Sequence, residues 1–171
     1  MTLDRPFEIR EARADDVPAL AALHVATFKE AHGQRSAPNY ELREAQWRTA
    51  FESGLNWFCY VAEASDGQLV GFAKGELHDG GVPAFEGELN KIYVLRAWHR
   101  SGIGRALIEQ VARRFLAQGV GSMLLFGDVH NPSNGFYERL GAERLFSPQG
   151  EFHGGYGWRD LRRLVPDALS T

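Results

Sequence analysis

The sequence has only one cysteine, Cys59, so it cannot form an internal disulfide. No apolar run approaches the length of a bilayer span, and the charged start MTLDRPFEIREARADD lacks the apolar core of a secretory signal. Charge of one sign is also scarce, because the net charge of −3 leaves no basic field for nucleic acid or anionic lipid. These absences predict a reduced, cytoplasmic protein with no nucleic-acid or membrane partner.

The composition itself is ordinary for a soluble globular protein, with 44% hydrophobic and 24% charged residues. The length fits one compact domain, and no internal repeat or low-complexity tract divides the chain. We therefore expect residues 1–171 to form a single domain.

Hydrophobic periodicity predicts an antiparallel first half. Strands are expected over three segments, residues 7–12, 57–64 and 68–77. A first helix presents one face made of Val17, Leu20, Ala21, His24 and Phe28. A second helix over residues 40–52 is expected to contact the sheet through Leu42, Ala45 and Trp47.

The second half reads as a strand–helix–strand unit followed by closing strands. A long strand is expected over 85–95, and a helix over 103–118 carries an apolar stripe formed by Ile103, Leu107, Val111 and Phe115. A short strand over 122–126 should run parallel to the long one. The remaining segments predict a helix over 131–140 and strands over 142–146 and 157–164.

A glycine-containing turn joins the long strand to this helix. Its residues are Arg100, Ser101, Gly102, Ile103, Gly104 and Arg105. A helix start offers backbone N–H groups without partners, and glycines let an anion approach them closely. The turn is therefore either a phosphate or pyrophosphate site or a strand–helix joint that binds nothing. A triphosphate P-loop is excluded because no Gly-Lys-Ser/Thr follows, and a dinucleotide fingerprint is excluded because Leu107 replaces its third glycine.

Two motifs together give the chain a family resemblance. The first is the strand end Ile92-Tyr93-Val94-Leu95 with the turn His99-Arg100-Ser101-Gly102-Ile103-Gly104. The second is the stretch NPSNGFYERLG, residues 131–141. In this order they resemble the signatures of the GCN5-related N-acetyltransferases. His99 departs from the Gln or Arg usual at its position, which leaves open one side-chain contact to the pyrophosphate.

The resemblance implies an α/β fold, with a mixed, mostly antiparallel sheet of six or seven strands and helices on both faces. It implies acetyl-CoA as co-substrate, with the pyrophosphate on the N–H groups of Arg100 to Arg105. The pantetheine arm would run beside Ile92, Tyr93 and Val94, in a slot where the fourth and fifth strands splay apart, and Asn131 would reach it. The fold also allows a homodimer.

For chemistry, the resemblance implies direct transfer of acetyl to a primary amine in a ternary complex. Tyr137 would protonate the leaving thiolate, and the Val94 N–H would stabilise the oxyanion. Glu88 is the candidate base; Glu86, two residues away, is expected on the same face and is the weaker candidate. The structural alternatives are a core aromatic at Tyr137 and a solvated strand end at Glu88.

Several other residues favour structural roles. His24 is expected to be a hydrogen-bonded core histidine, and Cys59 a buried strand residue. His78, Asp79, Glu86 and Glu88 lack the spacing of metal ligands. Aromatic residues between 35 and 57, and the loop over 152–156, either line the acceptor site or simply pack.

The sequence thus predicts an acetyl-CoA-dependent N-acetyltransferase that acts on a small-molecule or peptide amine. Two alternatives stay open. One is a non-catalytic acyl-CoA-binding sensor or regulatory module of the same fold, and the other is transfer of a longer acyl chain.

Overall fold

Seven strands form one mixed sheet in the order β1-β2-β3-β4-β5-β7-β6 in the computed structural model, which describes residues 5–33, 38–54, 56–78, 80 and 82–166. The strands are β1 (Phe7–Glu11), β2 (Trp57–Ala64), β3 (Leu69–Leu77), β4 (Gly87–Val94), β5 (Met123–Leu125), β6 (Glu143–Phe146) and β7 (Phe152–Trp158). β1 is antiparallel to β2, β4 is parallel to β5, and β7 is antiparallel to both β5 and β6. The predicted mixed α/β sheet is confirmed.

The α-helices in the described ranges are α1 (Val17–His32), α2 (Tyr40–Ser53), α3 (Ile103–Ala117) and α4 (Asn134–Arg139). Short 3₁₀ turns are η1 (Ala14–Asp16), η3 (Arg96–Trp98) and η4 (Leu161–Leu164). Local chemistry fixes the helix ends, as at α2, where Asn39 Oδ1 accepts a hydrogen bond from the Leu42 N–H at 2.9 Å. Within the described residues, no helix is both long and apolar enough to cross a membrane.

Contacts divide the chain into two compact units. The first unit is Met1–Lys74 with Lys91–Gln110, and the second is Gly75–Asn90 with Val111–Thr171. The division falls within β3, β4 and α3, so each of these elements contributes to both units.

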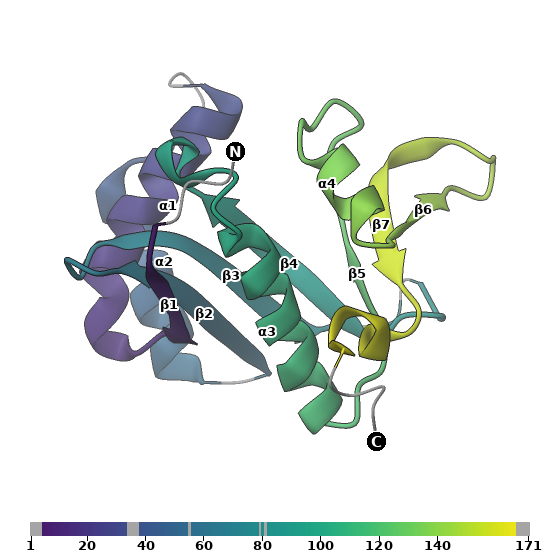
Figure 1. Ribbon diagram of the computed structural model, residues 1–171, viewed down its shortest axis with the longest axis horizontal. Helices are drawn as coiled ribbons and strands as arrows, with labels where there is room; N and C mark the ends of the chain where they lie inside the picture. Colours follow the sequence, from purple (N-terminus) through teal and green to yellow (C-terminus); the bar gives the residue numbers. More distant parts are fainter. Residues whose placement is uncertain (1–4, 34–37, 55, 79, 81, 167–171) are drawn as a thin grey trace. The chain divides into compact units, whose positions relative to one another are not determined.

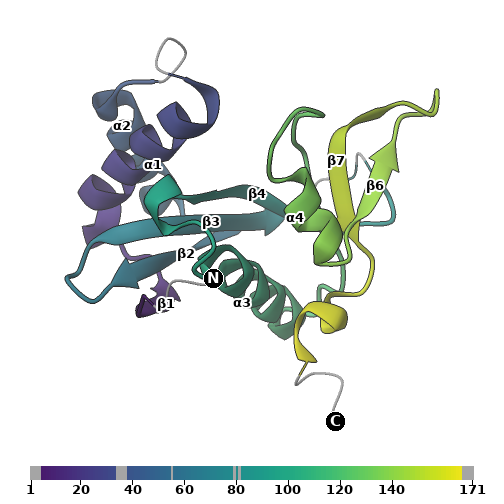
Figure 2. The ribbon, with the colours of Figure 1, turned by 45° about the horizontal axis from the view of Figure 1, so that its top comes forward.

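In the first unit, α1 and α2 cover one face of the sheet and the beginning of α3 covers the other (Figures 1 and 2). The core under α1 and α2 consists of Ala12, Val17, Leu20, Ala21, Leu23, Trp47, Cys59, Val61, Leu69 and Phe72. On the opposite face, Gly71 leaves room for α3, because a Cβ there would lie 3.1 Å from Ile103 Cγ2. The sheet is therefore buried on both faces in this unit.

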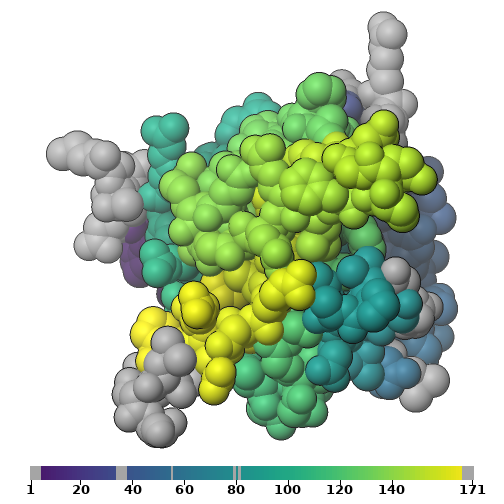
Figure 3. Space-filling model, turned by 90° about the vertical axis from the view of Figure 1, so that its right-hand side faces the viewer, coloured from purple at the N-terminus to yellow at the C-terminus, as the bar shows by residue number. Residues whose placement is uncertain are grey.

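In the second unit, aromatic rings lie where glycines leave space. A Cβ on Gly87 would lie 2.8 Å from the Phe115 ring, and one on Gly157 would lie 2.5 Å from the Phe85 ring. Arg159 also lies over Phe85, at 5.4 Å from the ring centroid. Figure 3 shows the segment before β4 next to the segment after β7, in teal and yellow. Glycine is thus required on β4 and β7 by the size of the facing rings.

Three predictions about elements were wrong. Leu42 is 49% exposed and Ala45 is also exposed, so of the three contacts predicted for α2 Trp47 is confirmed and the other two are wrong. Of the strand predicted over 157–164, only Gly157 and Trp158 belong to a strand, since β7 begins earlier, at Phe152. Leu161 and Leu164 are the buried ends of the 3₁₀ turn η4. The predicted loop over 152–156 therefore belongs to a strand.

Candidate active site

The turn between β4 and α3 has the backbone shape expected of an anion site. Arg100 and Gly102 both adopt positive φ angles, 63° and 88°. The first α3 hydrogen bond runs from the Ala106 N–H to the Gly102 carbonyl at 3.0 Å. The N–H groups of Ile103, Gly104 and Arg105 therefore precede the hydrogen-bonded ladder and face out of the helix start. A helix of this length concentrates partial positive charge there.

Space and charge at this turn also suit an anion. A Cβ built on Gly102 would meet nothing within 4 Å, so the backbone is open to a ligand. Arg100 is exposed, and the exposed Arg105 is tied to Glu109 by an ion pair of 3.3 Å. Ser101 Oγ donates to the Trp98 carbonyl and so closes the turn internally. Ser101 thus shapes the turn.

The strand before the turn places alternate residues on its two faces. Val94 lies on the α3 side, since its Cγ2 would be 3.3 Å from a Cβ on Gly71. The Tyr93 ring lies on the α1 and α2 side, 6.0 Å from the His24 ring and 5.7 Å from the Phe72 ring. His99 Nε2 donates to the Val94 carbonyl at 2.9 Å. His99 therefore fastens the turn to the strand end.

In the second unit, Glu88 belongs to a hydrogen-bonded network. Glu88 Oε1 lies 3.4 Å from His78 Nδ1, and Glu88 Oε2 accepts from Asn90 Nδ2 at 3.0 Å. The same amide nitrogen donates to Glu76 Oε1 at 2.8 Å. Glu88 is thus held from both oxygens, while its side chain is 17% exposed. A solvated strand end would not have this organisation.

The His78 side chain is 6% exposed, and its surroundings fix which ring nitrogen bears the proton. The Val82 N–H donates to His78 Nε2 at 3.1 Å, so Nε2 acts as an acceptor and has no proton. A neutral ring then carries its proton on Nδ1, where it is directed at Glu88. The sequence did not assign this role to His78, because its partner lies across a loop.

Glu86 is exposed and directly precedes β4. Its backbone N–H donates to Ser122 Oγ at 3.0 Å. The carboxylate that shares hydrogen bonds with the Glu88 network is instead Glu76.

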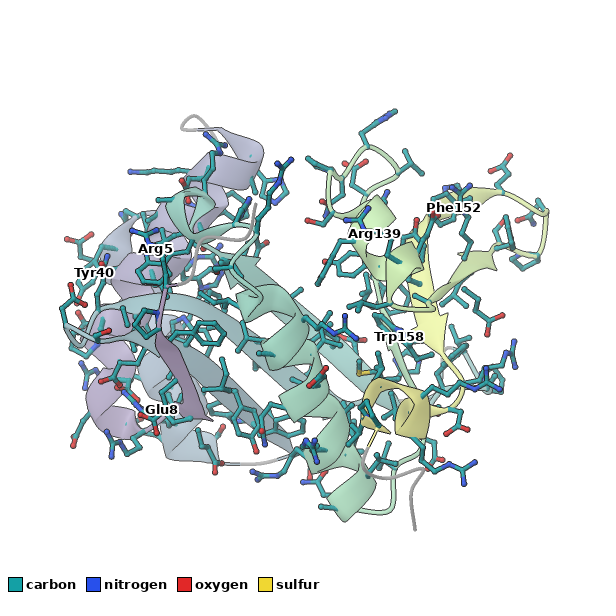
Figure 4. All side chains as sticks on the ribbon, viewed as in Figure 1. Arg5, Glu8, Tyr40, Arg139, Phe152 and Trp158 are labelled. Carbon is teal, nitrogen blue, oxygen red and sulfur yellow. The ribbon has the colours of Figure 1, made fainter. Side chains whose placement is uncertain are left out.

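Tyr137 lies on α4 and is 5% exposed. Its ring is 5.7 Å from that of Tyr156 and 6.3 Å from that of Trp158, both on β7. Trp158 Nε1 donates to the Leu140 carbonyl at the end of α4, which fixes the helix against the strand (Figure 4). Aromatic packing thus holds the Tyr137 side chain in a defined position.

Asn131 precedes α4, and its side chain has a local role. Asn131 Oδ1 accepts from the Ser133 N–H at 2.8 Å. Asn134 is a candidate that sequence reasoning missed: its Nδ2 donates to the carbonyls of Asp128 and Val129, at 3.0 and 3.1 Å. Its buried Oδ1 has no hydrogen-bond partner within the residues that the structure describes. A buried acceptor of this kind is available to a ligand N–H.

The remaining predictions concern structural residues and metal. His24 is 3% exposed and accepts a hydrogen bond from Trp47 Nε1 at 3.1 Å, which confirms its core role. Cys59 is 2% exposed and burial raises the pKa of its thiol, which confirms a buried strand residue. No group of three metal-ligating side chains occurs in the described ranges, and Asp79 lies outside them.

The candidate residues fall into two sets. The turn from Arg100 to Arg105 and the strand residues Ile92, Tyr93 and Val94 belong to the first unit. Glu88, Asn131 and Tyr137 belong to the second. A seven-stranded mixed sheet, in which a helix that begins at a glycine-containing turn connects the parallel strands β4 and β5, defines the class of acyl-CoA N-acyltransferase folds.

Comparisons with known proteins agree with this class. A model of the acetyltransferase (GNAT) family matches residues 17–142, so the chain belongs to that family. It is similar to the uncharacterized N-acetyltransferase YuaI of Bacillus subtilis, with 30% identity over 168 residues that cover 91% of this chain and 95% of the relative.

Solved structures show the same fold. A GNAT-family acetyltransferase from Staphylococcus aureus Mu50 has a TM-score of 0.72 at 16% identity, covering 91% of this chain and 99% of that one. The PaiA N-acetyltransferase of Thermoplasma acidophilum, in complex with coenzyme A, has a TM-score of 0.66 at 18% identity, covering 89% and 98%.

Proposed function

We propose that this protein transfers acetyl from acetyl-CoA to a primary amine by direct attack in a ternary complex, with both units acting as one acetyltransferase domain in the cytoplasm. The observation that carries the proposal is the turn before α3, where positive φ angles at Arg100 and Gly102 open a helix start toward an anion. Membership of the acetyltransferase family supports the same reaction class.

The turn residues bind the co-substrate in this proposal. The N–H groups of Ile103, Gly104 and Arg105 donate to the pyrophosphate, and Arg100 adds positive charge. The backbone of Ile92, Tyr93 and Val94 pairs with the pantetheine amides as an added strand would. Asn131 contributes its amide nitrogen, and Asn134 contributes its buried Oδ1, which has no partner within the described residues. Acetyl-CoA supplies an activated acetyl thioester.

Glu88 accepts the proton of the amine in this proposal. Two donors, His78 Nδ1 and Asn90 Nδ2, hold its carboxylate in one orientation. A positioned base of this kind needs no large movement before it accepts a proton. His78 is a positioning residue, since its ring holds Glu88 while the Val82 N–H holds the ring.

The other two roles follow from groups with fixed positions. The backbone N–H of Val94 donates to the oxygen that gains negative charge. The Tyr137 hydroxyl donates a proton to the leaving sulfur, and the packing against Tyr156 and Trp158 keeps the ring in place. With Cys59 buried and its thiol pKa raised, a cysteine nucleophile has no part in the reaction.

The test is release of free CoA thiol from acetyl-CoA across a panel of primary amines, alongside calorimetric binding of CoA. The proposal expects saturable binding and amine-dependent thiol release, with a mass increase of one acetyl group on the amine. Binding without thiol release for any amine would favour the acyl-CoA sensor module instead. Faster release from succinyl-CoA than from acetyl-CoA would favour the longer acyl chain.

A further inference from the structure

The Arg43 guanidinium on α2 has one buried donor without a partner among the residues that the structure describes. Arg43 Nη1 donates to Gln46 Oε1 at 3.1 Å, which occupies one end of the group. Its Nε atom is buried and has no hydrogen-bond acceptor in the described part of the chain. A buried donor without a partner costs free energy in the unbound protein, so this Nε is a candidate for ligand binding.

Arg43 lies above aromatic residues of neighbouring elements. Its Cζ is 5.3 Å from the Phe28 ring centroid on α1, and its charge interacts with the Tyr93 hydroxyl on β4. Tyr93 belongs to the strand segment assigned above to the pantetheine. The guanidinium therefore lies on the α1 and α2 side of the strand next to which the thioester is proposed to bind.

Further cations lie on the same side of the sheet. Lys74 Nζ on β3 is 5.4 Å from the Trp57 ring and 6.0 Å from the Trp47 ring. Neither Lys74 nor Arg43 has a carboxylate within 4 Å among the residues that the structure describes. Lys91 on β4 is close enough to act on the same buried histidine, His24.

The local field is accordingly positive. Burial lowers the pKa of His24 to about 3, and the charges of Arg43, Lys91 and Lys74 act in the same direction. Burial also lowers the pKa of the Arg43 guanidinium itself. An anion bound here would offset repulsion that the empty protein bears.

We propose that the amine acceptor also carries an anionic group, a carboxylate or a phosphoryl-type group, which the Nε edge of Arg43 binds while Lys74 adds charge. This inference rests on the proposed acetyl transfer and specifies its substrate class. Arg43 Nε and Nη2 form two parallel donors, the geometry that matches two oxygens of one anion. The ring of Phe28, which is only partly buried, lies next to the guanidinium and can contact an apolar part of the acceptor.

The first experiment measures binding without turnover. Calorimetry with free CoA present compares three sets of probes: the common amino acids, their carboxamides, and aminoalkyl phosphonates. We expect at least one acid to bind about 10- to 100-fold more tightly than its carboxamide, as a charged hydrogen-bonded pair provides. The phosphonates distinguish a phosphoryl site from a carboxylate site. Equal affinity of acids, phosphonates and carboxamides, or no binding by any anion, would overturn the inference.

The second experiment assigns the preference to residues. Arg43→Gln should remove the preference for the anionic probe while leaving the affinity for its carboxamide unchanged. Arg48→Gln is the matched control, because Arg48 lies on the same helix but is exposed and paired with Glu44 at 2.9 Å. Lys74→Gln, which leaves α2 intact, should reduce the preference by a smaller factor. An unchanged preference in folded Arg43→Gln and Lys74→Gln proteins would refute the assignment.

Kinetics separate this inference from the proposed function. If acetyl transfer is correct, Arg43→Gln should raise KM for the anionic amine about 10- to 100-fold and leave kcat nearly unchanged. Transfer to neutral amines only, with no effect of Arg43→Gln, would retain the transferase and reject the anionic acceptor. Anion binding without any transfer would retain the Arg43 site and reject the reaction.

Discussion

The two units each contain a charged region, and the two regions have opposite character. In the first unit, Lys74 and Arg43 lie among aromatic rings, and neither has a carboxylate within 4 Å in the part of the chain that the structure describes. In the second unit, Glu76 and Glu88 are joined by the amide of Asn90, and His78 holds Glu88 from its other oxygen. The region of Arg43 and Lys74 has donors that no carboxylate binds within the described residues, whereas in the region of Glu88 the donors Asn90 and His78 orient the proposed base.

The difference suggests that the first region binds a ligand and the second region transfers a proton. Open, unpaired donors suit a group that a ligand must satisfy, because binding then recovers the cost of burial. Fully bonded carboxylates suit a group that must stay in one orientation while a proton moves. Changes in the second unit should therefore act on kcat, and changes in the first unit on affinity or on stability.

Removal of the base should give the largest effect. Glu88→Gln keeps the hydrogen-bonding shape but cannot accept the amine proton, so kcat/KM should fall about 1000-fold, within the range for general base catalysis. Glu86→Gln is the control, since Glu86 is exposed and precedes β4. Equal activity of the two variants would contradict the assignment of Glu88 as the base.

Tyr137→Phe should have the next largest effect on activity. Loss of the hydroxyl removes the proton donor to sulfur, and kcat should fall about 100-fold while the Kd for CoA changes little. Tyr156→Phe removes a neighbouring hydroxyl that donates to Glu138 at 2.8 Å and should leave kcat unchanged. A fall in CoA affinity with kcat preserved would move Tyr137 from chemistry to binding.

A substitution in the turn before α3 should change the affinity for CoA. Gly102→Val places a side chain where φ is 88° and where the anion would approach, so the Kd for CoA should rise by about 10-fold or more. Gly119→Val carries the same backbone strain, at a φ of 79°, away from the turn. Both variants should lose similar stability in thermal unfolding. Unchanged CoA affinity in a folded Gly102→Val protein would disprove the pyrophosphate site.

The smallest effect concerns stability and pH. The pKa of His24 falls from 6.5 to about 3 on folding, chiefly through burial. Between these two pH values, His24 is protonated in the unfolded chain and neutral in the folded protein. The free energy of unfolding should therefore decrease as the pH falls from about 6.5 to about 3. The slope should approach about 1.4 kcal/mol per pH unit.

The control for this slope is a comparison of two histidine variants by urea unfolding across pH. His24→Gln should flatten the slope, because glutamine can still accept from Trp47 and does not titrate in this range. His130→Gln should leave the slope intact, since His130 is exposed. Identical slopes in all three proteins would show that His24 does not set the acid sensitivity.

Elements with strong periodic patterns could be predicted from the sequence. The stripe of α3 is 0–1% exposed throughout, and β2 has the bounds that its apolar run indicated. The first part of β7 was missed because Gly154 and Gly155 resemble a loop, whereas a Cβ on Gly154 would lie 2.5 Å from the Asp128 backbone. The turn and the Glu88 position followed from the motifs. The roles of Arg43 and His78 could not be predicted from the sequence. The role of Arg43 depends on an Nε atom without a partner among the described residues, and that of His78 depends on its contacts with Val82 and Glu88.

Three histidines of this protein use their ring nitrogens in two ways. His24 and His78 each accept a hydrogen bond, from Trp47 Nε1 and from the Val82 N–H. His99 instead donates from Nε2 to the Val94 carbonyl. Loss of the ring at position 24 or 78 would therefore leave an N–H donor without its acceptor, whereas loss of the ring at position 99 would leave a carbonyl without its donor and release the turn from the end of β4.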